Sequence, residues 1–132
     1  FSNDLSLKDV KLVIDAANVI GSRPTGWWRD RPAAALRFVE QVRATVIAGA
    51  LESPVTVVLE GQFRRGAAES DIDGVVVVHA SGEGDDTIAA VAAAHDGAVV
   101  VTADRGLAER VRAAGGTVVG PNWLLDRLVE VA

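Results

Sequence analysis

The sequence contains no cysteine and no methionine, and aromatic residues make up only 5% of its 132 positions. Without cysteine, the chain forms neither a disulfide nor a thiolate zinc site, and it has no thiol nucleophile. The absence of disulfides fits a reducing compartment, so we expect a cytoplasmic location. No apolar run is long enough to cross a bilayer and no secretory signal pattern is visible, so we expect no membrane partner.

Positive charge is also scarce, because 13 Lys and Arg residues stand against 18 Asp and Glu residues, giving a net charge of −5. A protein that binds a nucleic-acid backbone with much of its surface is normally basic, so the composition disfavours a general backbone binder. The distribution of the acids matters more than their sum. Carboxylates that hold divalent cations lose much of their net charge when the cations are bound.

Apolar residues, in contrast, make up 49% of the chain. A chain of this length fits one domain, spanning residues 1–132, and it can bury roughly two-thirds of its unfolded surface. Phe1 is not a natural first residue, so we expect that the chain was trimmed or belongs to a longer protein.

Short apolar strands alternate with helices along the whole sequence. Strands are predicted at residues 11–15, 55–59, 75–78, 98–101 and 117–119. Helices are predicted at about 32–50, 85–95, 104–115 and 121–128, with a loop at 18–30. The segment 60–73 is predicted to be mostly irregular or to form one short helical turn. Apolar strands separated by helices indicate a central parallel sheet with helices on both faces, which is a three-layer α/β fold.

Four aspartates fall where predicted strands end and helices begin. Asp15 ends the first strand and Asp104 follows the fourth, while Asp85 and Asp86 open the helix after the third. The carboxyl ends of parallel strands meet at one edge of a sheet, so these carboxylates are expected to converge. Convergent carboxylates raise each other's pKa, and a bound Mg²⁺ or Mn²⁺ relieves the repulsion. The acids therefore predict a site where a metal-activated water attacks a phosphodiester.

Some of these acids also have a structural role that competes with the metal-binding interpretation. Asp is a good helix cap, which is an alternative role for Asp85 and for Asp104. Asp15 is harder to explain in this way, because an acid that ends an apolar strand is costly to bury without a partner. Two nearby polar residues, Asn18 and Thr102, are expected to position a water, a phosphate or a metal ligand.

Candidate substrate contacts lie in the segments that follow the first, second and fourth strands. Arg64 and Arg65 are suited to holding phosphates, and Trp28 beside Arg29 is suited to stacking the bases of single-stranded RNA. Arg105 is expected to contact phosphate or to balance the charge of the neighbouring acid. The alternative is that the arginines lie in solvated surface loops and that the aromatic ring covers the core or a dimer interface.

Three stretches resemble the acidic motifs of NYN domains, a branch of the PIN-like ribonucleases. They are VIDAANVI at 13–20, GDDTI at 84–88 and VVTADRGL at 100–107. The resemblance covers nearly the whole chain and implies a PIN-like fold with the sheet order 3-2-1-4-5. It also implies RNA cleavage that depends on Mg²⁺ or Mn²⁺. PIN-like domains often pair, so a homodimer is one option, and the oligomeric state stays open.

Residue by residue, the resemblance makes metal ligands of Asp15, Asp85 and Asp104. It makes Asp86 a further ligand or supporting acid, and it makes Asn18 the amide of the first motif. Two departures from the family pattern stand out. Ala16 and Ala17 replace the usual glycine and larger residue, and Ala108 stands where some relatives carry a further acid, so that Glu83 is a candidate substitute.

Three functions remain open at this point. The first is a metal-dependent ribonuclease acting on single-stranded RNA. The second is a catalytically silent RNA-binding or protein-interaction module on the same fold, which the net negative charge and Ala108 favour. The third is a phosphohydrolase of small phosphoesters, although Ala17 stands where the haloacid type of this class needs a second aspartate.

Overall fold

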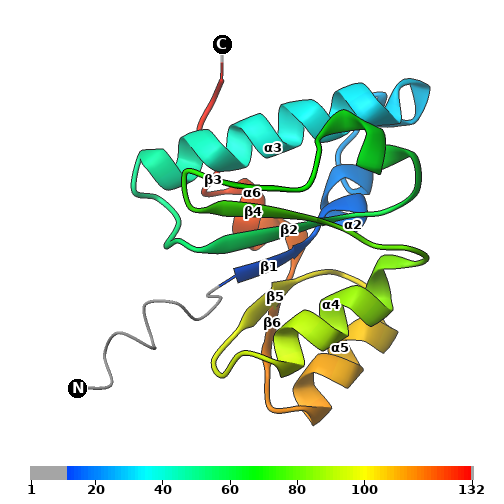
Figure 1. The fold of residues 1–132 in the computed structure, drawn as a ribbon, viewed down its shortest axis with the longest axis vertical. Helices are drawn as coiled ribbons and strands as arrows, with labels where there is room; N and C mark the ends of the chain where they lie inside the picture. The colour runs from blue at the N-terminus through cyan, green and yellow to red at the C-terminus, as the bar shows by residue number, and fades with distance from the viewer. Residues whose placement is uncertain (1–11, 132) are drawn as a thin grey trace.

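A central sheet with helices on both faces forms the protein in the computed structural model, which describes residues 12–131 (Figure 1). The strands are β1 Leu12–Asp15, β2 Val55–Leu59, β3 Ser70–Ile72, β4 Val75–His79, β5 Val99–Val101 and β6 Thr117–Val119. The helices are α2 Ala16–Gly21, α3 Arg31–Ile47, α4 Gly84–Ala93, α5 Arg105–Ala113 and α6 Pro121–Leu125, with short 3₁₀ helices η1 Trp27–Arg29 and η2 Gly61–Gly66. Residue 11, where the first strand was predicted to begin, lies outside the described residues. None of the described helices is both long and apolar enough to span a membrane.

The sheet confirms the predicted fold class and extends the predicted topology. Its order is β3-β4-β2-β1-β5-β6, and β4, β2, β1, β5 and β6 run parallel to one another. These five strands are the predicted ones in the predicted order 3-2-1-4-5. The sixth, β3, pairs antiparallel with β4 and was not predicted. It precedes a tight turn in which Asp73 and Gly74 both have positive φ, as a two-residue hairpin of Asp-Gly type requires.

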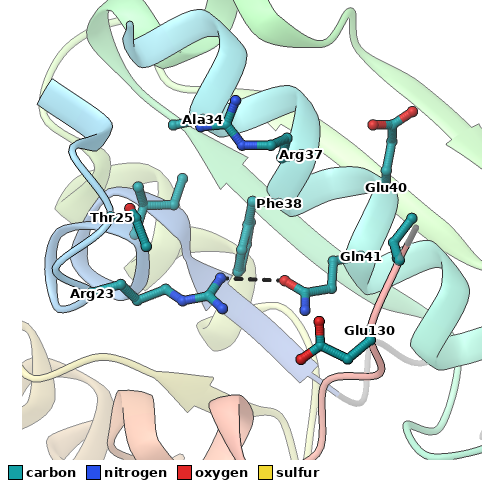
Figure 2. A pocket seen from close by; sticks show the side chains of 10 residues that line it. Arg23, Thr25, Ala34, Arg37, Phe38, Glu40, Gln41 and Glu130 are labelled. Carbon is teal, nitrogen blue, oxygen red and sulfur yellow. Dashed lines mark hydrogen bonds between the residues drawn. The ribbon is translucent and has the colours of Figure 1, made fainter. Parts of the chain in front are cut away.

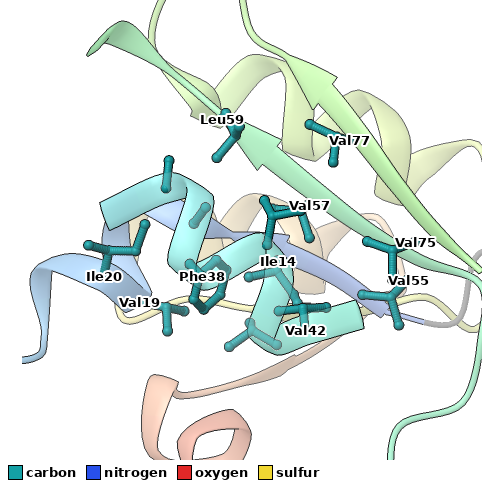
Figure 3. Packing of buried hydrophobic residues seen from close by; sticks show 14 of the residues in the cluster. Ile14, Val19, Ile20, Phe38, Val42, Val55, Val57, Leu59, Val75 and Val77 are labelled. Carbon is teal, nitrogen blue, oxygen red and sulfur yellow. The ribbon is translucent and has the colours of Figure 1, made fainter. Parts of the chain in front are cut away.

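Both faces of the sheet are covered, which explains why its strands are apolar throughout. Successive residues of a strand point to opposite faces, so Ile14 packs with α3 whereas Val13 packs with α4 and α5. Figure 3 shows the first of these layers, where Phe38 and Val42 of α3 lie against the side chains of β1, β2 and β4. Every residue of β1 and β2 is buried. This packing holds the carboxyl ends of the central strands in a fixed register.

Several helix boundaries differ from the sequence prediction. Residues 18–21, predicted to begin a loop, belong to the short helix α2. Asp15 is its N-cap and accepts a hydrogen bond from the backbone N–H of Asn18. Helix α4 begins at Gly84, so Asp85 lies in its first turn and does not cap it. The predicted cap of α5 is confirmed, because the Asp104 carboxylate accepts the N–H of Leu107 at 3.0 Å. The last helix ends at Leu125 rather than near residue 128.

A candidate acidic active site at the carboxyl edge of the sheet

An open pocket of about 380 Å³ lies where β1, β2 and β5 end. This edge of the sheet is the one at which β1 leads into α2 and at which α4 and α5 begin (Figure 1). The pocket is lined by Asp15, Ala17, Asn18, Glu60, Glu83, Asp85 and Asp104. The three aspartates predicted to converge from separate strand ends therefore share one pocket, and two glutamates join them. We call this group of residues the acidic pocket.

Asp15 is the most buried carboxylate of the acidic pocket, with only 5% of its surface exposed. Its pKa is raised from 3.8 to about 6, mainly by burial and to a smaller extent by the charges of Glu60 and Asp85. Two hydrogen bonds act in the opposite direction: the Thr102 hydroxyl donates to Oδ2 at 2.9 Å and the N–H of Asn18 donates to Oδ1 at 3.4 Å. The pocket thus holds a carboxylate whose charge is incompletely compensated by its neighbours.

Thr102 and Asn18 tie the end of β1 to the loop that follows β5. While it donates to Asp15, the buried Thr102 hydroxyl accepts the backbone N–H of Asp104 at 3.1 Å. The side-chain oxygen of Asn18 accepts the N–H of Ala103 at 2.7 Å. Both residues therefore fix the relative positions of Asp15 and Asp104, and the amide NH₂ of Asn18 is the part of that side chain left to meet a water or a phosphate.

Asp85 approaches the same pocket from the first turn of α4. Desolvation raises its pKa, and the charges of Asp104 and Glu83 raise it further, while Arg110 lowers it. Gly84 allows this close packing, because a Cβ at that position would lie 2.9 Å from Oε1 of Glu60. From the sequence, Glu83 was only a candidate substitute for the acid missing at Ala108, and Glu60 was not among the predicted ligands. The structure places both in the lining of the pocket, because each adjoins a strand end or helix start at this edge.

The donor chemistry of the acidic pocket fits a hard divalent cation, which prefers oxygen ligands and would offset the repulsion that raises the pKa values of Asp15 and Asp85. The side chains do not form a ready-made ligand set. Within residues 12–131, no three acidic or histidine side chains lie close enough together to hold an ion as they stand. Binding an ion would therefore require the carboxylates to turn toward one another.

Asp86 lies outside this group, although the sequence pattern placed it beside Asp85. Its side chain is 91% exposed and forms an ion pair with Arg110, with the Nη1 and Oδ1 atoms 3.0 Å apart. It does not line the acidic pocket. The structure therefore brings together Asp15, Asn18, Asp85 and Asp104 of the five residues predicted to be catalytic, and it directs the fifth toward solvent.

None of the predicted substrate contacts lines the acidic pocket. Arg64 and Arg65 line a pocket beside η2, and Arg105 lines a groove beside α5. On η1, the ring of Trp28 is 51% exposed, and the guanidinium carbon of Arg29 lies 5.6 Å from its centroid. The neighbouring Trp27 is half-buried and packs edge-on against Trp28. One tryptophan thus packs inward while the other presents its ring to solvent.

A separate pocket of about 360 Å³ lies between α2, α3 and the segment after α6 (Figure 2). Arg23 donates to the side-chain oxygen of Gln41 at 3.2 Å across this pocket, and Gln41 in turn donates to the carbonyl of Val129. Glu40 and Glu130 supply opposite charge in the lining. None of the predicted site residues lines this pocket, so it is distinct from the acidic pocket.

Comparison with known proteins relates the chain to one family and one fold. The model of the DUF188 family, described as "Uncharacterized BCR, YaiI/YqxD family", matches residues 35–123. No curated protein matches the sequence. Among solved structures, a crystal structure of a mutant of Rae1 (YacP) from Bacillus subtilis is similar, with a TM-score of 0.59 and 19% sequence identity over 87% of this chain and 71% of that chain. At this identity the likeness concerns the fold, and it agrees with the predicted three-layer α/β architecture.

Proposed function

This chain belongs to the uncharacterised YaiI/YqxD family, and from that premise we propose that it is a metal-dependent ribonuclease that hydrolyses RNA phosphodiester bonds at the acidic pocket. The observation that carries the proposal is the set of carboxylates from separate strand ends and helix starts lining one pocket, with Asp15 buried and its pKa raised. A globular chain retains a buried, repelled carboxylate at a cost to its stability. Such a cost is common where a charge serves a function.

The proposed ligands for Mg²⁺ or Mn²⁺ are Asp15, Asp85 and Asp104, with Glu60 and Glu83 in the same lining. When bound, the ion would supply an activated water and neutralise charge that develops on the phosphate. Thr102 keeps Asp15 oriented through its hydroxyl, and the Asn18 side chain holds the loop after β5 in place. These contacts form before any substrate arrives, so the protein maintains the geometry of the pocket at rest.

The proposed substrate is single-stranded RNA. The exposed ring of Trp28, with Arg29 beside it, presents a surface on which an unpaired base stacks, and such stacking requires no particular sequence. Arg64, Arg65 and Arg105 lie around the acidic pocket and carry the positive charge that a phosphate backbone requires. The negative net charge of the whole chain is compatible with this arrangement, because these three arginines line pockets that adjoin the acidic residues in sequence.

The proposal is tested by titrating the protein with Mn²⁺ and following the cleavage of a labelled single-stranded RNA. We expect cleavage to require the metal, to stop in EDTA, and to remain within about threefold of wild type in Asp86→Asn, because that side chain points to solvent. Metal binding without RNA cleavage, together with hydrolysis of small phosphoesters, would favour a phosphohydrolase. The absence of both metal binding and cleavage would identify a silent binding module and would contradict the proposal.

Replacing Thr102 by valine is expected to lower cleavage by about 10- to 100-fold, the range found when a residue that orients a metal ligand is lost. The substitution leaves Asp15 Oδ2 and the N–H of Asp104 without their shared hydroxyl partner. A Thr102→Ser variant retains that hydroxyl and should recover most of the activity. The distinguishing measurement is the Mn²⁺ concentration at half-maximal activity, which should rise in Thr102→Val and not in Thr102→Ser. An unchanged metal requirement in Thr102→Val would assign this residue a purely structural role.

A further inference from the structure

Two pockets that contain arginine flank the acidic pocket along the same edge of the sheet. The first, of about 480 Å³, lies beside η2 and includes Arg64, Arg65 and His79 in its lining. The second, of about 390 Å³, lies between α5 and β6 and includes Arg105 and Arg112. We call them the η2 pocket and the α5 groove.

Both pockets are continuous in sequence with the acidic pocket. The η2 pocket begins at Gly61, the residue after Glu60, and the α5 groove begins at Thr102 and Ala103, just before Asp104. In the sheet, the η2 pocket lies at the ends of β2 and β4, whereas the α5 groove lies at the ends of β5 and β6. The acidic pocket, at the ends of the strands between them, is therefore in the middle of the row.

The arginines of both pockets are not paired with carboxylates among the described residues. Across residues 12–131, the ion pair that the structure contains joins Arg110 and Asp86, so Arg65, Arg105 and Arg112 are outside any ion pair. In the η2 pocket, Arg64 is fixed by hydrogen bonds to the backbone carbonyls of Gly61 and Ala80, at 3.2 and 3.3 Å. A guanidinium held in this way still has a free nitrogen with which to bind a phosphate.

Along the α5 groove, the two arginines lie on the same side of the helix. Arg105 and Arg112 are seven residues apart, which is close to two turns and about 10 Å along the helix axis. Arg105 stands at the mouth next to the acidic pocket, and Arg112 stands further down the groove. Glu109 lies between them in the lining, so the groove carries an excess of one positive charge and is not uniformly basic.

We propose that the η2 pocket and the α5 groove are two phosphate-binding subsites for one RNA strand, which crosses the carboxyl edge of the sheet so that substrate is held on both sides of the bond at the acidic pocket. This inference rests on the proposed ribonuclease function and adds to it the course of the substrate. The strand ends of β4 and β6 are four strand spacings apart, which is about 19 Å. A single nucleotide is too short to contact both subsites, so their joint use requires a continuous strand.

The arrangement has a direct consequence for the reaction. A strand bound on both sides of the cleaved bond needs no free end at the pocket, so internal bonds are the expected targets. Arg112 becomes a substrate-positioning residue that lies eight positions from the nearest residue of the acidic pocket, Asp104.

The test compares the binding of labelled oligouridines of about three and about twelve nucleotides, measured by fluorescence anisotropy in EDTA and again in Ca²⁺, with a gel confirming that they stay intact. The variants are Arg65→Ala for the η2 pocket, Arg112→Ala for the α5 groove, and the double variant. Arg37→Ala is the matched control, because Arg37 is an exposed arginine on α3 that lines the separate pocket of Figure 2.

Each single variant should weaken binding of the longer oligouridine by about three- to tenfold and reduce the slope of log affinity against log salt by about 0.7. The effects should multiply in the double variant with the longer probe. With the shorter probe, which occupies one subsite at a time, each single variant should weaken binding less than it does with the longer probe, because the other subsite is still available.

Arg112→Ala binding the longer probe as tightly as Arg37→Ala would overturn the proposal, and so would equal behaviour of the two probe lengths. A different result would contradict the ribonuclease function alone. A protein that shows this length-dependent binding but cleaves no RNA in Mn²⁺ would retain the two subsites while contradicting the catalytic function.

Discussion

Asp15→Asn is expected to abolish metal-dependent RNA cleavage while making the metal-free protein more stable. We expect activity to fall by more than about 100-fold, since the loss of a direct ligand should exceed the loss of a residue that merely orients one. The stability change has the opposite sign because the buried carboxylate is disfavoured at neutral pH. Its pKa is about 6 instead of 3.8, so ionising it in the folded protein costs on the order of 2–3 kcal/mol.

An asparagine at position 15 removes that charge while its side-chain oxygen still accepts a hydrogen bond from Thr102. After allowance for the imperfect fit of the amide NH₂, we expect a gain of about 1–2 kcal/mol in the free energy of unfolding. The measurement is urea unfolding at pH 7 in EDTA, beside the cleavage assay. Asp126→Asn, an exposed aspartate at the end of α6, is the control and should change neither quantity. A destabilised Asp15→Asn protein would show that this carboxylate is needed mainly to hold the fold.

The stability of the metal-free protein should also fall as the pH rises from about 4 to about 7. Between the unfolded value of 3.8 and the folded value of about 6, the Asp15 carboxyl binds more protons in the folded state than in the unfolded state. Its protonated form therefore favours folding at low pH, and this contribution is lost as the pH rises through about 6. The raised pKa of Asp85 acts in the same direction.

The experiment records the melting temperature against pH in EDTA and in Mg²⁺ for wild type and for Asp15→Asn. Other carboxyl groups also titrate in this range, so the informative quantity is the difference between the two proteins. In EDTA, the melting temperature of Asp15→Asn minus that of wild type should increase by about 5 °C between pH 4 and pH 7. Mg²⁺ should raise the melting temperature of wild type at pH 7 and leave the variant nearly unchanged, since a cation takes over the role of the protons. A pH-independent difference would contradict the burial of an ionisable group at position 15.

The parallel core of the fold could be predicted from the sequence because its strands are buried on both faces and carry a strong apolar pattern. The strand β3 has no such pattern, since Asp71 and Ile72 are exposed and Ser70 is only half-buried. The local signal for it was the Asp73–Gly74 pair, which is a hairpin turn sequence. Helix α2 escaped prediction for a different reason: it is six residues long and its N-cap is the same aspartate that ends β1.

The acidic pocket could be predicted only as far as the backbone determines it. Strand ends of a parallel sheet meet at one edge, which was enough to bring Asp15, Asp85 and Asp104 together. The direction of a side chain depends on its position around a helix, where successive residues point about 100° apart. This is why Asp85 enters the pocket and Asp86, one residue later, meets Arg110 in solvent. The same helical period places Arg112 on the same side of α5 as Arg105, about two turns further along.

The hydrogen bond between Thr102 and Asp15 joins residues that are 87 positions apart in the chain. Strand β1 also pairs with both β2 and β5, and the ribosome synthesises β5 well after β2. A nascent polypeptide that has emerged only as far as α3 carries Asp15 but none of the acids that line the pocket with it. In a finished chain, cleavage between β2 and α4 would leave Asp15 on one fragment and Asp85 and Asp104 on the other. The nuclease proposed here would thus be inert while it is being made, and one proteolytic cut in the segment 61–83 followed by separation of the pieces would be enough to silence it.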